Sequence, residues 1–418
     1  MKIGRYTASA LLIIVGALLL IDQLFKTNGL SYLFGWWPVV LIGLGAEYLI
    51  VGSKNRDAQK PLRIDVGGVF FALLISAVVV VVTHPSIQAF PFLKHLNLNF
   101  DRIGDFASSV GENGHKFEKE TVRVPLGPNT DTVSIEIPNG SAMVKTGNVT
   151  NVEIAPTVYV DRVNDERAQG IADRSRVEFT EGGTLRIVAK GEEYEVGMFQ
   201  YKPRINLTVT VPETARLNYS IVTQNGKIEG TQLSLKNEFK GTTTNGSIEI
   251  SGMNGNVVME TTNGKITAEN INGSVDLKTT NGSIRVYGIH GNASLISTNG
   301  ELVAKQVEGN VKLRSSNGRI TVDDAARSIR ANTTNSGISA SSPAMGGDWE
   351  LYTTNGKIEV ALPMSAGFTV DGKAGNGDVE NLFPGLEING KKIQGRIGDG
   401  SHQMKMETSG SISLRPLH

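Results

Sequence analysis

Thr-Gln-Asn-Gly at 223–226 opens a series of near-copies: Thr-Thr-Asn-Gly at 243–246, 261–264 and 279–282, Ser-Thr-Asn-Gly at 297–300, Ser-Ser-Asn-Gly at 315–318, Thr-Thr-Asn-Ser-Gly at 333–337 and Thr-Thr-Asn-Gly at 353–356. The asparagines of this series are Asn225, Asn245, Asn263, Asn281, Asn299, Asn317, Asn335 and Asn355. Their spacings are 20, 18, 18, 18, 18, 18 and 20 residues. A fixed period of this size indicates a repeat architecture, in which each unit stacks on the next.

One period, residues 263–280, contains two short alternating segments, Lys265–Ala268 and Ser274–Thr279. Their alternation, with an apolar residue between them, puts one set of side chains on the same side. That set is Ile266, Ala268, Ile271, Val275 and Leu277. Adding 18 or 36 to these numbers again gives apolar residues at every position, whereas the outward positions vary. The pattern predicts a parallel β-solenoid of about 18 residues per rung, in an otherwise all-β region.

Stacked rungs would place asparagine on asparagine as an amide ladder, about 4.8 Å apart. We expect the glycine after each asparagine to supply a corner with positive φ. The alternative is an antiparallel meander, because Asn-Gly between alternating segments is also a strong hairpin signal. A meander gives no reason for a constant period, so the solenoid is favoured.

The flanking segments predict less regular structure. Residues 121–222 read as an irregular β cap with the first rungs, including one helix at about Asn164–Arg176. Regular repeats occupy 223–360, and 361–418 should form the last rungs and a closing cap. Such caps cover strand edges that would otherwise be open.

Three apolar runs near the N-terminus, at about 8–25, 30–51 and 66–83, have the length of membrane-spanning helices. They define a membrane domain at 1–85, joined to the β region by a linker at 86–120. Lys2 and Arg5 precede the first run, and four basic residues lie between 54 and 63. Because basic residues favour the cytoplasmic side, the N-terminus is expected to be cytoplasmic and the chain after about 83 extracytoplasmic.

Composition narrows the chemistry. Lys plus Arg and Asp plus Glu both number 41, and this balance argues against a nucleic-acid partner. The chain has no cysteine, and its histidines lack metal-ligand spacing, so we expect no catalytic residues, no metal site and no cofactor. A polysaccharide-active β-helix enzyme is the catalytic alternative, but no column of carboxylates forms along the repeat.

One outward row, just after each Asn-Gly, leans basic. Its cations are Lys227, Lys265, Arg319 and Lys357. The row could meet an anionic wall polymer or anionic lipid headgroups, because aligned charges produce a local field. It could equally be a solubilising face.

Two segments resemble known bacterial families. Gly-Trp-Trp-Pro-Val-Val-Leu-Ile-Gly-Leu-Gly at 35–45 is similar to the LiaI/LiaF-like transmembrane region of envelope-stress proteins. The Thr-Thr-Asn-Gly-x-Ile repeats and the closing Ser-Gly-Ser-Ile-Ser-Leu at 409–414 resemble a family of candidate adhesins of unknown function with a β-solenoid. The second resemblance covers about 121–415 and implies the fold but no catalytic residues.

The sequence therefore predicts a non-catalytic protein of the bacterial cell membrane with the lipid bilayer as one partner. Its solenoid would serve adhesion, envelope binding or stress sensing, with a cell-wall polymer, anionic lipid or another membrane protein as the second partner. The alternative is a regulator of a membrane sensor kinase or envelope-stress response that acts through the transmembrane helices.

Overall fold

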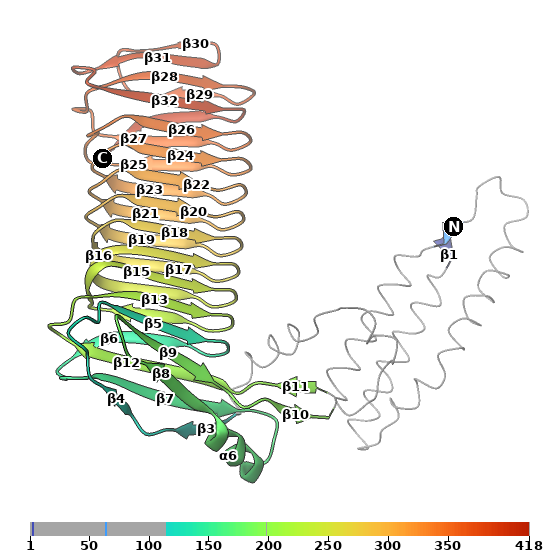
Figure 1. Ribbon diagram of the computed structural model, residues 1–418. Helices are drawn as coiled ribbons and strands as arrows, with labels where there is room; N and C mark the ends of the chain where they lie inside the picture. The colour runs from blue at the N-terminus through green and yellow to red at the C-terminus, as the bar shows by residue number, and fades with distance from the viewer. Residues whose placement is uncertain (1, 4–62, 65–113, 198, 418) are drawn as a thin grey trace, which may run out of the picture. The chain divides into compact units, whose positions relative to one another are not determined.

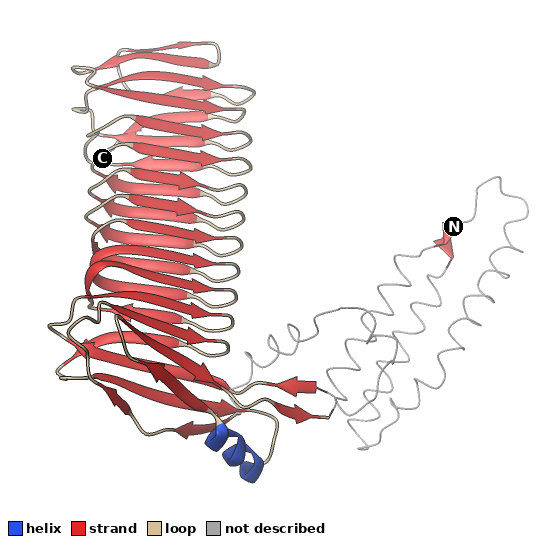
Figure 2. Ribbon diagram, in the orientation of Figure 1, coloured by secondary structure: helices blue, strands red, loops and turns tan. Residues whose placement is uncertain are grey.

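The computed structural model describes residues 2–3, 63–64, 114–197 and 199–417, in which the regular elements are strands and one helix, joined by turns and loops (Figure 2). The chain divides into two compact units, and the unit described below comprises residues 104–194 and 201–418. In the other unit, β1 (Lys2–Ile3) pairs in parallel with β2 (Arg63–Ile64). The three predicted membrane helices and most of the predicted linker lie outside the described residues. Within the described residues, no helix has the length and apolar content to cross a membrane.

Residues 132–147, 217–381 and 402–416 build a stack of rungs in two layers (Figure 1). Each rung contributes to both layers, and one long strand, β16 (Ile248–Thr261), runs from one layer into the other. Layer 1 runs, in spatial order, through β5 (Thr132–Ile137), β13 (Leu217–Thr223), β15 (Ser234–Thr243), β16 (Ile248–Thr261), β18 (Val275–Thr279), β20 (Ala293–Ile296), β22 (Val311–Arg314), β24 (Ile329–Thr333), β26 (Trp349–Thr353), β32 (His402–Thr408) and β28 (Phe368–Ala374).

Layer 2 runs through β6 (Ala142–Gly147), β14 (Ile228–Thr231), β16, β17 (Ile266–Asn272), β19 (Ile284–Ile289), β21 (Leu302–Val307), β23 (Ile320–Ala325), β25 (Ile338–Ser341), β27 (Ile358–Leu362), β33 (Ile412–Pro416) and β29 (Val379–Asn381). Every neighbouring pair within both layers is parallel. The solenoid is therefore confirmed, and the antiparallel meander is wrong for the repeats.

The register confirms the predicted period. Ile266 pairs with Ile284, Ile284 with Leu302, and Leu302 with Ile320, so equivalent residues stack. The predicted inward columns are buried: Ile266, Ala268, Ile271, Val275 and Leu277 expose 2% of their surface or less. Each such burial of a large aliphatic side chain contributes about 1.5–3 kcal/mol. Repetition of this small core along the stack holds the rungs together.

The core is bulkiest near the ends of the stack. One inward column of layer 1 continues from Val133 to Tyr219 and Phe239, whose rings stack 5.5 Å apart, and narrows to Ala293 in the middle. It widens again to Trp349, which is fully buried. A period alone does not reveal this change in width, since all these residues are apolar.

Antiparallel strands close the N-terminal end, where the sequence predicts an irregular cap. β7 (Val152–Val160) pairs with β12 (Arg204–Pro212), β3 (His115–Glu118) and β4 (Val122–Val124), and β8 (Arg176–Thr180) pairs with β9 (Thr184–Lys190). β12 and β9 join this cap to the rungs through parallel pairing with β6 and β5. β3 falls inside the predicted linker, so the sheet begins earlier than expected.

The other described elements of this part of the sequence are a helix and a two-stranded sheet. The predicted helix is α6 (Asp165–Arg174), and the side chain of Asn164 caps it by accepting a hydrogen bond from the backbone N–H of Arg167 at 3.1 Å. β10 (Tyr194–Val196) and β11 (Phe199–Tyr201) form a separate two-stranded sheet.

At the C-terminal end the chain departs from sequential stacking. β32 lies between β26 and β28, and β33 lies between β27 and β29. The last rung in sequence therefore lies between residues 349–362 and residues 368–381, although both of these segments precede it in the chain. β31 (Lys392–Ile397) and β30 (Leu386–Asn389) then cover β28 as antiparallel strands.

Candidate functional site

The asparagine ladder forms as expected. Each Asn side chain of the series donates from Nδ2 to Oδ1 of the asparagine in the rung before it, in seven bonds of 2.7–2.9 Å from Asn245 to Asn355. All eight predicted corner asparagines thus lie in one row. Their amides are occupied by one another, so the row is a structural feature.

The predicted role of the corner glycines is wrong. Gly264, Gly282 and Gly300 do not have positive φ. They are required because consecutive corners stack so closely that a Cβ on Gly282 would overlap the carbonyl oxygen of Gly264. The space between rungs, and not the backbone angle, selects glycine here.

Positive φ occurs instead at a second bend, within or just after the strands of layer 2. The residues in this column are Gln232, Gly252, Asn270, Gly288, Gln306 and Asp324, with φ between +52° and +66°. Asn and Asp are enriched in this conformation and Gly adopts it freely, which explains most of the column. The sequence contains only a weak signal for this second bend, because the column also includes Gln, which is not typical of positive φ.

A buried hydroxyl column, which the sequence analysis missed, lies two residues before each asparagine. The hydroxyl of Thr279 donates to the carbonyl oxygen of Gly264 at 3.1 Å and accepts from the N–H of Gly282 at 3.2 Å. Thr261, Ser297 and Ser315 repeat both bonds in their own rungs. Each hydroxyl satisfies a donor and an acceptor of the corner backbone, which would otherwise be buried unpaired.

The predicted basic row is partly neutralised by neighbouring carboxylates. Lys227 lies 2.6 Å from both Glu229 and Glu249, and Lys357 lies 2.8 Å from Glu359. Burial lowers the pKa of Lys227, but the hydrogen bonds with the two glutamates outweigh it and the pKa is raised. Lys265 and Arg319 are exposed. The row thus presents isolated cations and does not form a continuous basic strip.

The structure reveals a groove that the sequence did not indicate, on the outer surface of layer 1 near its C-terminal end. We name it the axial groove, and it encloses about 620 Å³. Its outward side chains come from successive strands and are paired in register: Arg314, Asn332, Tyr352, Glu407 and Lys373.

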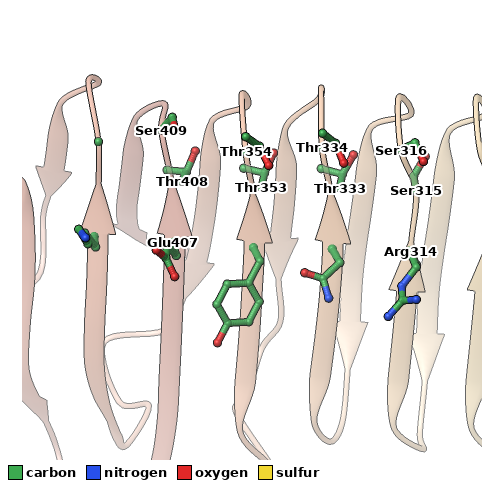
Figure 3. A pocket seen from close by; sticks show the side chains of 14 residues that line it. Arg314, Ser315, Ser316, Thr333, Thr334, Thr353, Thr354, Glu407, Thr408 and Ser409 are labelled. Carbon is green, nitrogen blue, oxygen red and sulfur yellow. The ribbon is translucent and has the colours of Figure 1, made fainter.

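A row of hydroxyls forms the second wall of the axial groove. Figure 3 shows Ser316, Thr334, Thr354 and Ser409 close to the turns, with Arg314 and Glu407 further down their strands. The hydroxyls of Thr333, Thr353 and Thr408, which also line the groove, donate to carbonyl oxygens of the corners. The outer row is therefore the one that faces a ligand.

The charged and amide side chains of the axial groove have no partners among the described residues. The side chains of Arg314, Asn332, Glu407 and Lys373 take part in no ion pair or hydrogen bond within that part of the chain. By contrast, elsewhere on layer 1 Lys278 pairs with Glu260 at 2.8 Å and Arg330 with Glu350 at 3.2 Å. The groove presents hydrogen-bonding groups that are free to meet a ligand.

A shallower hollow of about 400 Å³ lies where the strands of layer 1 begin. Three of its polar side chains are already used: Asn256 accepts from the N–H of Ser274, Ser274 from that of Asn292, and Asn292 from that of Asn310. Asp276, Ser294 and Lys312 also line this hollow, but its lining includes no aromatic side chain.

Metal and acid–base chemistry find little support in the described ranges. Residues 114–197 and 199–417 contain no cluster of three or more His, Asp or Glu that could hold a metal ion. Asp323, which is adjacent to Asp324 in the sequence, accepts a hydrogen bond from the hydroxyl of Ser341 at 2.9 Å and lies 3.5 Å from Lys305. Its neighbours are those of a solvated structural carboxylate.

Comparison with known families shows to which family the chain is related. Residues 147–415, well over half of the chain, match the family described as Toastrack DUF4097. The chain belongs to the Toastrack family. Residues 6–49 match the LiaI-LiaF-like transmembrane region, so this Toastrack protein carries a membrane segment at its N-terminus. Both resemblances drawn from the sequence are confirmed.

Solved structures similar to this Toastrack chain include a candidate lipid-binding protein and a candidate adhesin, both from Parabacteroides distasonis. They are 13% and 12% identical, with TM-scores of 0.33 each, and the alignments cover 73% and 72% of this chain and 98% of each of theirs. A candidate cell adhesion protein from Clostridium sporogenes is 11% identical with a TM-score of 0.18, over 72% of this chain and all of its own. Similarities this low carry no argument about function. No curated protein matches the chain.

Proposed function

We propose that this Toastrack protein is a non-catalytic binding protein of the bacterial cell envelope. Its N-terminal domain, with helices at about 8–25, 30–51 and 66–83, would hold the solenoid on the extracytoplasmic side of the membrane. The match of residues 6–49 to a transmembrane family supports the anchor, and the basic residues around the first and second runs support the orientation.

The axial groove is the observation that carries the binding role. A rigid stack of hydrogen-bonded rungs holds Arg314, Asn332 and Glu407 in fixed register, and no described residue satisfies them. The strands that carry these groups are already positioned, so the backbone needs no ordering on binding and only the side-chain rotamers lose entropy.

Hydrolysis of a bound polymer is not supported by the same site. Glycoside hydrolysis uses two carboxyl groups on opposite sides of one bond, about 5–10 Å apart. The axial groove has one carboxylate, Glu407, among its lining residues. We therefore assign the groove to binding.

The test is retention of the full chain, reconstituted in neutral-lipid nanodiscs, on insoluble wall material from bacterial cells. We expect the protein to sediment with the wall, and empty nanodiscs to remain in solution. Failure to sediment at low and moderate salt would contradict the envelope-binding role. Protease added to intact cells should release a solenoid fragment into the medium, and retention of residues 121–418 by the treated cells would contradict the orientation.

A second candidate function is regulation of a membrane sensor kinase through the transmembrane helices. The observation that favours it is the LiaI-LiaF-like match at 6–49, because that region is shared with envelope-stress proteins. Expression of residues 1–90 alone separates the two functions. If this fragment reproduces the signalling phenotype of the full chain, regulation is the principal role; if it does not, the solenoid is required.

A further inference from the structure

We infer that the ligand of the axial groove is an extended carbohydrate chain that lies along the stack and crosses the strands. The inference rests on the proposed envelope-binding function and names the ligand class of that site. It starts from the order of the outward side chains, which is Arg314, Asn332, Tyr352, Glu407 and Lys373 on five neighbouring strands of layer 1.

The dimensions of the groove fit a short run of sugars. Four steps between five strands, at about 4.8 Å each, give a path of about 19 Å from Arg314 to Lys373. One sugar residue of an extended chain advances by about one such step, so neighbouring sugars would meet equivalent positions on neighbouring rungs. The outer hydroxyls, from Ser316 to Ser409, repeat with the same spacing along this path.

The chemistry of the lining also fits a sugar. Tyr352 is half-buried and supplies one aromatic surface for the apolar C–H face of a sugar ring. Asn332 and Glu407, on the strands either side of it, supply a planar amide and a planar carboxylate for ring hydroxyls. Arg314 and Lys373 stand at the two ends, where they would receive acidic or acetamido substituents.

Other classes of ligand fit less well. A peptide cannot add to these strands by backbone pairing, because β24, β26 and β32 are paired on both sides. A lipid tail needs an apolar cavity, whereas arginine, lysine, glutamate and hydroxyls line this groove. A polyphosphate would meet the carboxylate of Glu407, which lies between the two cations and directly beside Lys373, and this carboxylate opposes a uniformly anionic chain.

The test measures binding of fluorescent, peptide-free glycan strands from bacterial wall to the full chain in neutral-lipid nanodiscs. Tyr352→Ala should weaken binding roughly tenfold, the loss expected for one aromatic contact. Tyr352→Phe should change it by less than about twofold, since the ring remains. Arg314→Gln should weaken it for acidic strands more than for neutral oligosaccharides.

Matched controls are available on the same stack. Tyr287→Ala removes an exposed tyrosine from layer 2, and Lys265→Ala removes a cation of the basic row. Neither should change binding. The thermal midpoint of each variant, measured alongside, identifies any that fail to fold. If Tyr352→Ala fails to fold, Arg314→Gln carries the test, and Tyr352→Phe is the variant with which its binding is compared.

The outcomes separate this inference from the proposed function. If the parent sediments with wall but Tyr352→Ala binds strands as the parent does, the groove inference is wrong and the envelope role stands. Binding lost in Lys265→Ala, or binding to poly(glycerol phosphate) in place of sugar strands, also overturns the inference. A parent that binds neither wall nor strands overturns both proposals.

Discussion

Two glycines of one rung show that the same residue type is selected for two reasons. Gly282 has ordinary backbone angles, but a Cβ there would overlap the carbonyl oxygen of Gly264 in the rung before. Gly288 has a φ of +66°, and a Cβ would be about 3.0 Å from the Oδ1 of Asn270. The first position excludes every side chain, and the second excludes only residues that resist a left-handed conformation.

We predict opposite outcomes for substitutions at these positions. Gly282→Ala should lower the free energy of unfolding by at least about 3 kcal/mol or prevent folding, because close backbone stacking cannot relax in one rung alone. Gly288→Asn should cost less than about 1 kcal/mol, since Asn270 and Asp324 occupy the same column with φ of +54° and +58°. Urea denaturation followed by circular dichroism checks both. Similar midpoints for the two variants would contradict the distinction.

At the scale of the element, the asparagine ladder couples neighbouring rungs. Asn281→Ala removes two amide hydrogen bonds, to Asn263 and from Asn299, whereas Asn355→Ala removes the one to Asn335. With about 0.5–1 kcal/mol for each exposed bond, the loss of stability should be about twice as large at Asn281. Urea midpoints of the two variants measure the ratio. Equal losses would show that the asparagines act through their corner conformation alone.

A second element-scale prediction concerns pH. The hydrogen bond from Lys357 holds the pKa of Glu359 below its ordinary value of 4.5, and the charges of Arg415 and Arg319 act in the same direction. Because the folded pKa is lowered, this pair stabilises the fold above about pH 4.5, and the contribution is lost as pH falls through the folded pKa. The pair is partly exposed, so the effect is below about 1 kcal/mol.

Comparison of the parent with Glu359→Gln at pH 7 and pH 3 isolates this contribution. The variant should be less stable at pH 7 and should lose less stability on acidification than the parent does. Denaturation curves at both pH values give the two differences. A variant whose stability falls as steeply as that of the parent would exclude Glu359 as a source of the pH dependence.

The sequence predicted the strands and their buried columns better than it predicted the hydroxyl column and the axial groove. Period and alternation predicted the parallel rungs, the buried columns at Ile266 and Leu277, and the asparagine ladder, because these repeat. The buried hydroxyl of Thr279 was missed, since its neighbour Thr280 has the same chemistry and only packing separates them. The axial groove was missed because its side chains differ in type from rung to rung, and because Glu407 adjoins Tyr352 only through the C-terminal insertion.

At the scale of the whole molecule, the inserted last rung ties the end of the stack together. β32 lies between β26 and β28, and β33 lies between β27 and β29, so the facing edges of these four earlier strands are paired only when β32 and β33 are in place. Glu407 of the axial groove also comes from β32. Stability and the candidate site therefore both depend on the C-terminal segment.

Deletion of residues 402–418 should make a longer segment than the deleted one accessible to protease. β28 and β29 lose their parallel partners, so we expect residues 363–401 to become sensitive to limited proteolysis while 132–341 stay resistant. A matched deletion of 386–397 removes only the antiparallel cover and should leave 349–362 and 402–416 protected. Mass spectrometry of the fragments distinguishes the two patterns. Continued resistance of 363–401 in the first variant would contradict the dependence.

The insertion also has a consequence for how the protein is made. Ribosomes release residues in order, so most rungs can stack as soon as they emerge, each on the one before. The edges of β26 and β27 cannot obtain their final partners until residues 402–416 have been synthesised. A chain that stops before residue 402 therefore has an open or wrongly paired edge that proteases can recognise. The fold distinguishes a chain that contains residues 402–416 from one that stops before them.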